Sequence, residues 1–160
     1  MRRIKTLILT ALVIFVVAQF VRFKHTNPPV TGDVNAPPQV AAILHRACYN
    51  CHSNLTRWPW YSEVAPVSWL VYHDVSDGRH HLNFSTWNLY ASDPQTLANK
   101  LKHIKKEVND DDMPPLYYRP MHPNSHLSAA DRQAIVEWVD GELARLKPAS
   151  ASGAVPAASE

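Results

Sequence analysis

The sequence predicts an all-α protein, in which a compact helical domain follows a separate apolar helix at the amino terminus. Apolar residues recur at helical spacing in four segments between residues 37 and 147. No segment alternates apolar and polar residues over the length of a strand, and the Asn-Gly dipeptide that often closes a β-hairpin does not occur. One long apolar run with basic flanks fills most of residues 1–25.

The amino-terminal run predicts a transmembrane signal anchor over residues 1–25. From Ile4 to Phe23 it is twenty residues long, or about 30 Å as a helix, which matches the hydrocarbon thickness of a bilayer. A cleaved signal peptide is the alternative, but residues 17–22 contain no small-x-small cleavage site. Basic residues at the amino end of the run favour retention of that end in the cytoplasm. We therefore expect a single pass through the inner membrane, with the rest of the chain on the exported, periplasmic side.

The remainder of the chain divides by composition into three parts. Residues 26–36 contain Pro28 and Pro29, and they predict an extended linker that lifts a domain off the membrane. Residues 37–147 are long enough for one small domain. Residues 148–160 are small and polar, which predicts a disordered tail. The formal net charge is only +2 and no dense basic stripe occurs, so nucleic-acid binding is not expected.

Prolines, a glycine and apolar spacing predict the first two helices of the domain. Pro37 and Pro38 stand where prolines open helices, and the apolar stripe after them runs into Cys48. A second helix begins near Ser62 or Pro66 and is expected to stop at Gly78. The apolar faces of these helices are Val40, Ile43 and Leu44, and then Val67, Leu70, Val71 and Val75.

Capping residues predict the last two helices. Asp93 is an N-cap followed by proline at the first helical position, and an apolar face then runs to Val108. Ser128 and Asp131 are close to a capping box and open the final helix. The expected buried residues are Leu97, Leu101 and Ile104 in one helix and Ile135, Trp138, Val139 and Leu143 in the other.

The sequence Cys48-Tyr49-Asn50-Cys51-His52 has the pattern Cys-x-x-Cys-His, which attaches c-type haem. Two thiols three positions apart can add to the two vinyl groups of one porphyrin, and the adjoining histidine can bind the iron. Both cysteines of the chain lie in this motif, so we predict one haem c, bound covalently through Cys48 and Cys51. Haem c is attached on the exported side of bacterial membranes, which agrees with the predicted anchor.

Other uses of a Cys-x-x-Cys pair find less support in the sequence. A thioredoxin-like redox pair requires a βαβ context, which is missing here. A structural zinc site needs a second ligand pair at zinc spacing, and His73, His80 and His81 are distant and irregularly spaced. A structural disulfide across two intervening residues has poor geometry.

Met113 is the predicted second axial ligand of the iron, opposite His52. It precedes Pro114 and Pro115, which restrict the backbone and can hold a flexible thioether in place. Methionine paired with histidine is a common ligand set in haem electron carriers. Met121 is the alternative methionine, and the histidine alternatives are His80, His81, His103, His122 and His126.

Aromatic residues close to the motif predict further contacts with the cofactor. Trp58, Trp60 and Tyr61 can donate hydrogen bonds to the haem propionates while their rings pack against the porphyrin edge. Ordinary aromatic packing in the domain core is the alternative role for each of them.

These motifs resemble those of a known family. A Cys-x-x-Cys-His after a helix, then Met-Pro-Pro and a terminal helix resemble the class I cytochromes c, and more specifically the bacterial haem-binding domain family of small exported proteins. The resemblance covers roughly residues 38–146 and implies haem c on Cys48, Cys51 and His52, with Met113 as the sixth ligand. The matching segments are Cys48–Asn54, Trp58–Tyr61, Ala65–Trp69, His81–Ser85, Met113–Pro115 and Leu127–Ser128.

The sequence therefore predicts a cytochrome c-like domain wrapped around one haem and tethered to the membrane. We expect a monohaem electron-transfer protein, more an electron carrier than an enzyme. Its expected partners are redox proteins and the cytochrome c maturation machinery. A haem sensor or haem enzyme with an exchangeable sixth ligand is the alternative function.

Overall fold

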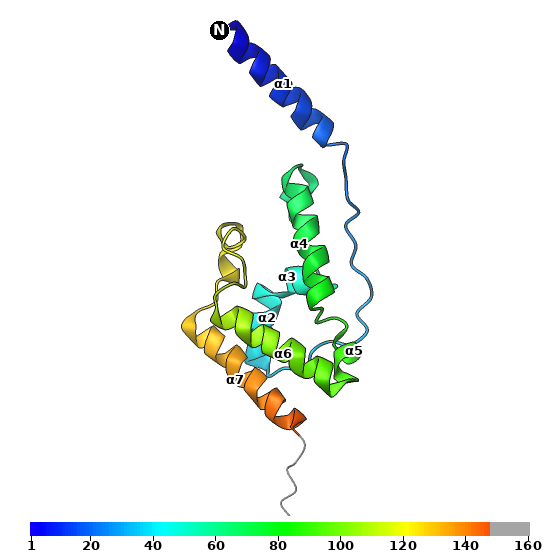
Figure 1. Cartoon of the computed structure of the whole chain (residues 1–160), viewed down its shortest axis with the longest axis vertical. Coiled ribbons are helices and arrows are strands. Elements are labelled where there is room, and N and C mark those ends of the chain that lie inside the picture. Colours follow the sequence, from blue (N-terminus) through cyan, green and yellow to red (C-terminus); the bar gives the residue numbers. More distant parts are fainter. Residues whose placement is uncertain (148–160) are drawn as a thin grey trace, which may run out of the picture.

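The computed structural model describes residues 1–147, and over this range the protein is all-α, with no strand. This confirms the predicted fold class. Short 3₁₀-helices lie between the α-helices (Figure 1). The elements are α1 (Arg2–Ala18), α2 (Pro38–Ala47), α3 (Tyr49–His52), η1 (Trp60–Glu63), α4 (Val67–His81), α5 (Trp87–Ala91), α6 (Pro94–Asn109), η2 (Arg119–Met121), η3 (Pro123–Ser125) and α7 (Ala129–Leu146).

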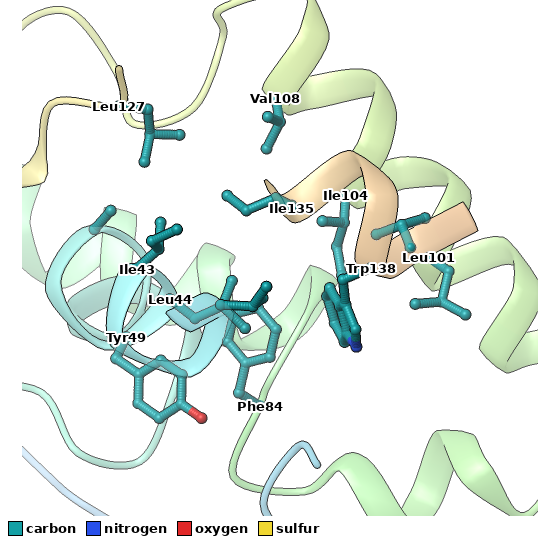
Figure 2. Close-up of a cluster of buried hydrophobic side chains, with 13 residues drawn as sticks. Ile43, Leu44, Tyr49, Phe84, Leu101, Ile104, Val108, Leu127, Ile135 and Trp138 are labelled. Atoms are coloured by element: carbon teal, nitrogen blue, oxygen red, sulfur yellow. The ribbon is translucent and has the colours of Figure 1, made fainter. Parts of the chain in front are cut away.

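The hydrophobic core lies where α2, α6 and α7 meet, with Phe84 entering from the segment between α4 and α5 (Figure 2). Leu44, Leu101, Ile135 and Phe84 are almost completely buried. Burying apolar surface of this kind is the dominant stabilising term in folding. The predicted apolar faces of the first, third and fourth helices of the domain are therefore confirmed, with Leu97 and Leu143 at the edge of the cluster.

The predicted helix starts at Asp93 and Ser128 are confirmed. The Asp93 carboxylate accepts hydrogen bonds from the backbone amides of Gln95 and Thr96 at the start of α6. Ser128 and Asp131 form a reciprocal capping box at the start of α7. Both caps satisfy amides that a helix cannot pair internally, which fixes where each helix begins.

The prediction that the second helix of the domain stops at Gly78 is wrong. α4 continues through Gly78 to His81. Of its predicted apolar face only Val75 is buried, whereas Val67 and Leu70 are exposed. The glycine serves close packing against α3, as described below, and the exposed residues border a cavity.

The predicted apolar helix at the amino terminus is wrong at its carboxyl end. α1 has 17 residues and stops at Ala18, short of Phe23. The chain turns there because Gln19 is bound to the domain: its side-chain oxygen accepts from the amide of Ala65 (3.0 Å), and its side-chain nitrogen donates to the Ala65 carbonyl (3.1 Å). Across residues 1–147, no helix has both the length and the apolar character needed to cross a bilayer.

The segment predicted as a linker is extended, but it lies against the domain rather than standing free. It runs alongside α4 and then reaches the segment before α5 (Figure 1). Hydrogen bonds join the backbone of this segment to side chains and backbone carbonyls of the domain. The contacts are Arg79 to the Thr26 carbonyl (2.8 Å), Asn54 to the Pro29 carbonyl (2.9 Å) and the Thr31 amide to the Ser85 carbonyl (2.9 Å). Trp69 Nε1 likewise donates to the carbonyl of Val21, in the segment predicted as the anchor (2.9 Å).

Candidate functional site

The Cys-x-x-Cys-His motif forms the short helix α3 at the end of α2. Cys48 ends α2 through a bond from its amide to the Leu44 carbonyl (2.8 Å), and its own carbonyl accepts from the His52 amide (2.9 Å). One helical turn therefore separates the two cysteines and carries His52 directly after them. Both thiols are free. The structure thus brings together the three motif residues that the sequence predicted.

The imidazole of His52 is held by α4. Its Nδ1 lies 2.9 Å from the carbonyl oxygen of Gly78 and 3.1 Å from that of Leu82. Carbonyl oxygens only accept, so Nδ1 carries the hydrogen and Nε2 keeps its lone pair. Burial lowers the pKa of His52, which also favours the neutral ring. Within the part of the chain that the structure describes, Nε2 has no hydrogen-bond partner, so it is available as a ligand.

Gly78 allows α4 to approach α3 closely. A Cβ atom at Gly78 would lie 2.7 Å from the backbone oxygen of Cys51 and 3.2 Å from its Cβ. Only a residue without a side chain fits at this crossing. The same residue therefore provides both the contact with Cys51 and the carbonyl that orients His52.

A cavity of about 340 Å³ lies beside the motif. Cys48, Cys51, His52 and Met113 all line it. Much of the remaining wall is apolar and comes from the core, including Leu44, Phe84, Ile104, Val108 and Ile135. The predicted ligand pair, His52 and Met113, thus borders one apolar space together with both thiols.

An ion-pair network that the sequence reasoning missed holds the loop of Met113. Asp111, at the end of α6, has a left-handed backbone (φ 61°) and pairs with Arg119 (2.8 Å) and with Arg132. Arg119 also donates to the carbonyl of Pro114, directly after Met113 (2.7 Å). These hydrogen bonds hold the pKa of Asp111 below its usual range. The only sequence signal was the run of acidic residues 110–112, which does not reveal its partners.

Two alternatives, a redox-active cysteine pair and a metal site made of several side chains, find no support in these groups. Burial raises the pKa of Cys48 to about 12 and that of Cys51 to about 11, whereas redox-active cysteines have lowered pKa values. Across residues 1–147, no three His, Cys, Asp or Glu side chains gather in an arrangement that could hold a metal ion. Two thiols, an imidazole nitrogen and a thioether around an apolar cavity are instead the groups that bind a haem.

Comparison with known families agrees with this donor set. Residues 13–141 match the family described as the haem-binding domain. The chain belongs to the haem-binding domain family. No curated protein and no solved structure matches it. The family match begins inside α1, so the haem-binding domain as matched includes the extended segment that packs on α4.

The predicted aromatic residues do not line the haem-binding domain's motif cavity. Trp58 stacks on His25, with ring centroids 4.1 Å apart. Trp60 and Tyr61 border a second cavity, together with Met121 and His122. A role for Trp58, Trp60 and Tyr61 at the haem propionates stays a prediction. Of the other histidines named from the sequence, His81 and His103 lie on the motif cavity.

Proposed function

We propose that this haem-binding protein carries one covalent haem c and transfers electrons, with the iron bound between His52 and Met113. The observation that supports this most is the fixed ring of His52, whose Nδ1 is bonded to two carbonyls while the ring lines a cavity with Cys48, Cys51 and Met113. A bound haem c supplies one-electron chemistry between ferric and ferrous iron. Its attachment would require the cytochrome c maturation machinery.

Two side-chain ligands favour electron transfer over catalysis. Both axial positions would be filled by the protein, and neither would remain open to a small molecule. The loop that carries Met113 is restrained by Asp111 and Arg119, so the thioether is held in place. Redox partner proteins would then exchange electrons with the haem.

The test is the absorption spectrum of the full chain, produced in a host that matures cytochromes c. We expect a ferric low-spin spectrum with the long-wavelength charge-transfer band of sulfur-bound iron. Met113→Ala should lose this band, whereas Met121→Ala should keep it. A high-spin ferric spectrum, or ready carbon monoxide binding by the reduced wild-type protein, would instead support a haem sensor or enzyme.

Covalent attachment has a separate test. After denaturing electrophoresis the wild-type band should stain for haem, because thioether bonds survive denaturation. Cys48→Ser together with Cys51→Ser should abolish the stain. A colourless wild-type band would contradict covalent attachment of haem c. Haem binding without a covalent bond would then be measured on the native protein.

We also propose that the amino-terminal helix α1 attaches the protein to the inner membrane, with the haem-binding domain on the exported side. The apolar side chains of α1 support this, since none of its residues is buried, and so do the basic residues at its amino end. The full chain should stay with the membrane pellet after an alkaline carbonate wash. Deletion of residues 2–18 should release it, and pelleting of the deleted chain would contradict this attachment.

A further inference from the structure

A second cavity, of about 290 Å³, is lined by Cys51 but by neither Cys48 nor His52. Its volume is at the lower end of the range of small-molecule pockets. α4 provides Val67, Leu70, Val71 and Val75, and η1 and the loop around η2 provide aromatic residues. It shares Cys51, Asp74, Tyr117 and Tyr118 with the motif cavity, so a ligand here would lie beside the proposed point of haem attachment.

The mouth of this cavity is apolar and lies near the end of α1. Trp60, Leu70 and Met121 on its border are 74%, 47% and 57% exposed, whereas Val75 at its inner end is 3% exposed. The residues between Trp60 and Leu70 include Ala65 and Trp69, which bond to Gln19 and Val21 just after α1. Figure 1 shows the amino-terminal end of α4 and the yellow loop at η2 and η3 both projecting toward the side where α1 lies.

Asn50, Thr56, Arg57 and Asp74 also border the cavity, and one hydrogen-bonded pair lies among its aromatic residues. The Tyr61 hydroxyl and Nε2 of His122 are hydrogen-bonded at 2.5 Å. The ring of Tyr118 stacks on the imidazole with centroids 3.9 Å apart, which fixes its plane. Burial lowers the pKa of His122, which favours the neutral ring. Its Nδ1 has no hydrogen-bond partner among residues 1–147 and can bond to a ligand oxygen.

We propose that this second cavity binds a lipid-soluble ring of the quinone class, taken up from the bilayer. The aromatic and aliphatic lining suits a flat apolar ring, and the Tyr61–His122 pair suits a ring oxygen. The exposed apolar border lies beside the segment that leaves α1, so a molecule dissolved in the membrane would reach it without crossing water. This inference rests on the membrane attachment proposed above. Arg57 and Asp74 both border the cavity, so their charges offset each other and do not select a charged metabolite, and a lipid acyl chain would leave the Tyr61–His122 pair unused.

The experiment is photo-cross-linking of the haem-loaded full chain in lipid nanodiscs with an azidoquinone, followed by mapping of the labelled peptides. We expect labelling within residues 60–75 and 117–122, suppressed by an excess of a short-chain ubiquinone analogue. Val71→Trp fills the cavity and should lower this labelling by about tenfold or more, as expected when a ligand is sterically excluded. Leu89→Trp, on the exposed face of α5, is the matched control and should label like the wild type.

A second variant keeps the test informative if Val71→Trp fails to fold. His122→Leu removes one hydrogen bond to the ligand and should weaken competition by the analogue about fivefold. Labelling unchanged in both variants, or confined to α1, would overturn the proposal. Labelling of the same residues by a photoreactive phospholipid, with no competition from the analogue, would assign the cavity to an acyl chain instead. The haem stain and the carbonate wash are repeated on the same samples. They show whether haem attachment and membrane attachment hold independently of the labelling result.

Discussion

Nδ1 of His52 donates a hydrogen bond to the backbone oxygen of Gly78 at a distance of 2.9 Å, and the Cα of that same glycine faces Cys51 across the crossing of α3 and α4. A histidine that binds a metal commonly donates its other ring N–H to a backbone carbonyl or a carboxylate. Here α4 supplies that carbonyl from within a helix, and it can do so only because the helix comes unusually close. Packing and ligand orientation therefore depend on one residue.

Replacing Gly78 with alanine should destabilise the protein and disturb the site. The new Cβ would lie 2.7 Å from the backbone oxygen of Cys51, which cannot move without moving the motif. Crowding of this kind costs about 2 kcal/mol, more than alanine gains from its higher helix propensity. The free energy of unfolding, measured with denaturant, should fall by that amount, and the haem spectrum should lose low-spin character.

Gly141→Ala is the matched control for this change. Gly141 also lies within a helix, α7, but a Cβ there would meet nothing within 4 Å. The substitution should therefore be neutral or stabilise the fold by up to about 1 kcal/mol. Equal effects at the two glycines would show that close approach to Cys51 does not explain Gly78.

Local signals in the sequence predicted the helix starts and the motif. Asp93 and Ser128 were predictable because an N-cap bonds to amides two or three residues away, within one segment. The turn of helix that holds Cys48, Cys51 and His52 was predictable for the same reason. Gly78 was misread as a helix end because its role depends on how two helices cross, and no pattern within α4 records that.

The positions of Met113 and Tyr61 depend on contacts with residues that are distant in the sequence. Met113 was predicted as the second axial ligand, and it lines the motif cavity with His52. Its loop, however, is restrained through the pair of Asp111 with Arg132 of α7, twenty-one positions away. Tyr61 was predicted near the haem because it follows the motif closely. That role stays a prediction, and nothing in the sequence indicated that its hydroxyl pairs with His122, sixty-one positions away, on the border of the second cavity.

Asp111→Asn should loosen the loop of Met113 without forcing a change of backbone. Asparagine accepts the left-handed conformation of this position, so the substitution removes mainly the charge that pairs with Arg119 and Arg132. We expect a weaker sulfur-to-iron charge-transfer band and a lower reduction potential, measured by spectroscopic titration. Asp110→Asn is the control, since among residues 1–147 the ion-pair partner of Asp110 is the exposed Lys106. An unchanged band and potential in Asp111→Asn would contradict a positioning role for this network.

The ion pair of Asp131 with Arg46 should make the free energy of unfolding depend on pH. The two are 2.7 Å apart, and this contact lowers the pKa of Asp131 to about 2. A carboxylate with a lowered pKa stabilises the fold above the pKa of the unfolded chain, which is about 4, and loses this effect as the pH falls to about 2. Asp131→Asn should cost about 1 kcal/mol of unfolding free energy at pH 6 and clearly less at pH 2, where the carboxylate is already partly protonated.

Urea denaturation at a series of pH values measures this difference. Asp140→Asn is the control, because its pair with Lys105 is exposed and should contribute less than about 0.5 kcal/mol at any pH. A gap between the wild type and Asp131→Asn that stays constant from pH 6 to pH 2 would rule out the ionised pair as its cause.

Arg79→Lys should release the extended segment from the domain. The guanidinium of Arg79 donates to the carbonyls of Ser53 and Thr26 and to the side chains of Asn27 and Thr56, at 2.7 to 2.9 Å. An ammonium keeps the charge but cannot reach this fork of acceptors. The free energy of unfolding should fall by about 2 kcal/mol, and limited proteolysis should cut the segment before Asn27 much faster than in the wild type. Arg145→Lys, which alters one exposed pair on α7, should change neither measurement. Arg79→Lys with the wild-type free energy of unfolding and the wild-type rate of proteolysis would contradict this prediction. The bonds of Arg79 would then contribute nothing to the fold, and the segment after α1 would only lie on the domain.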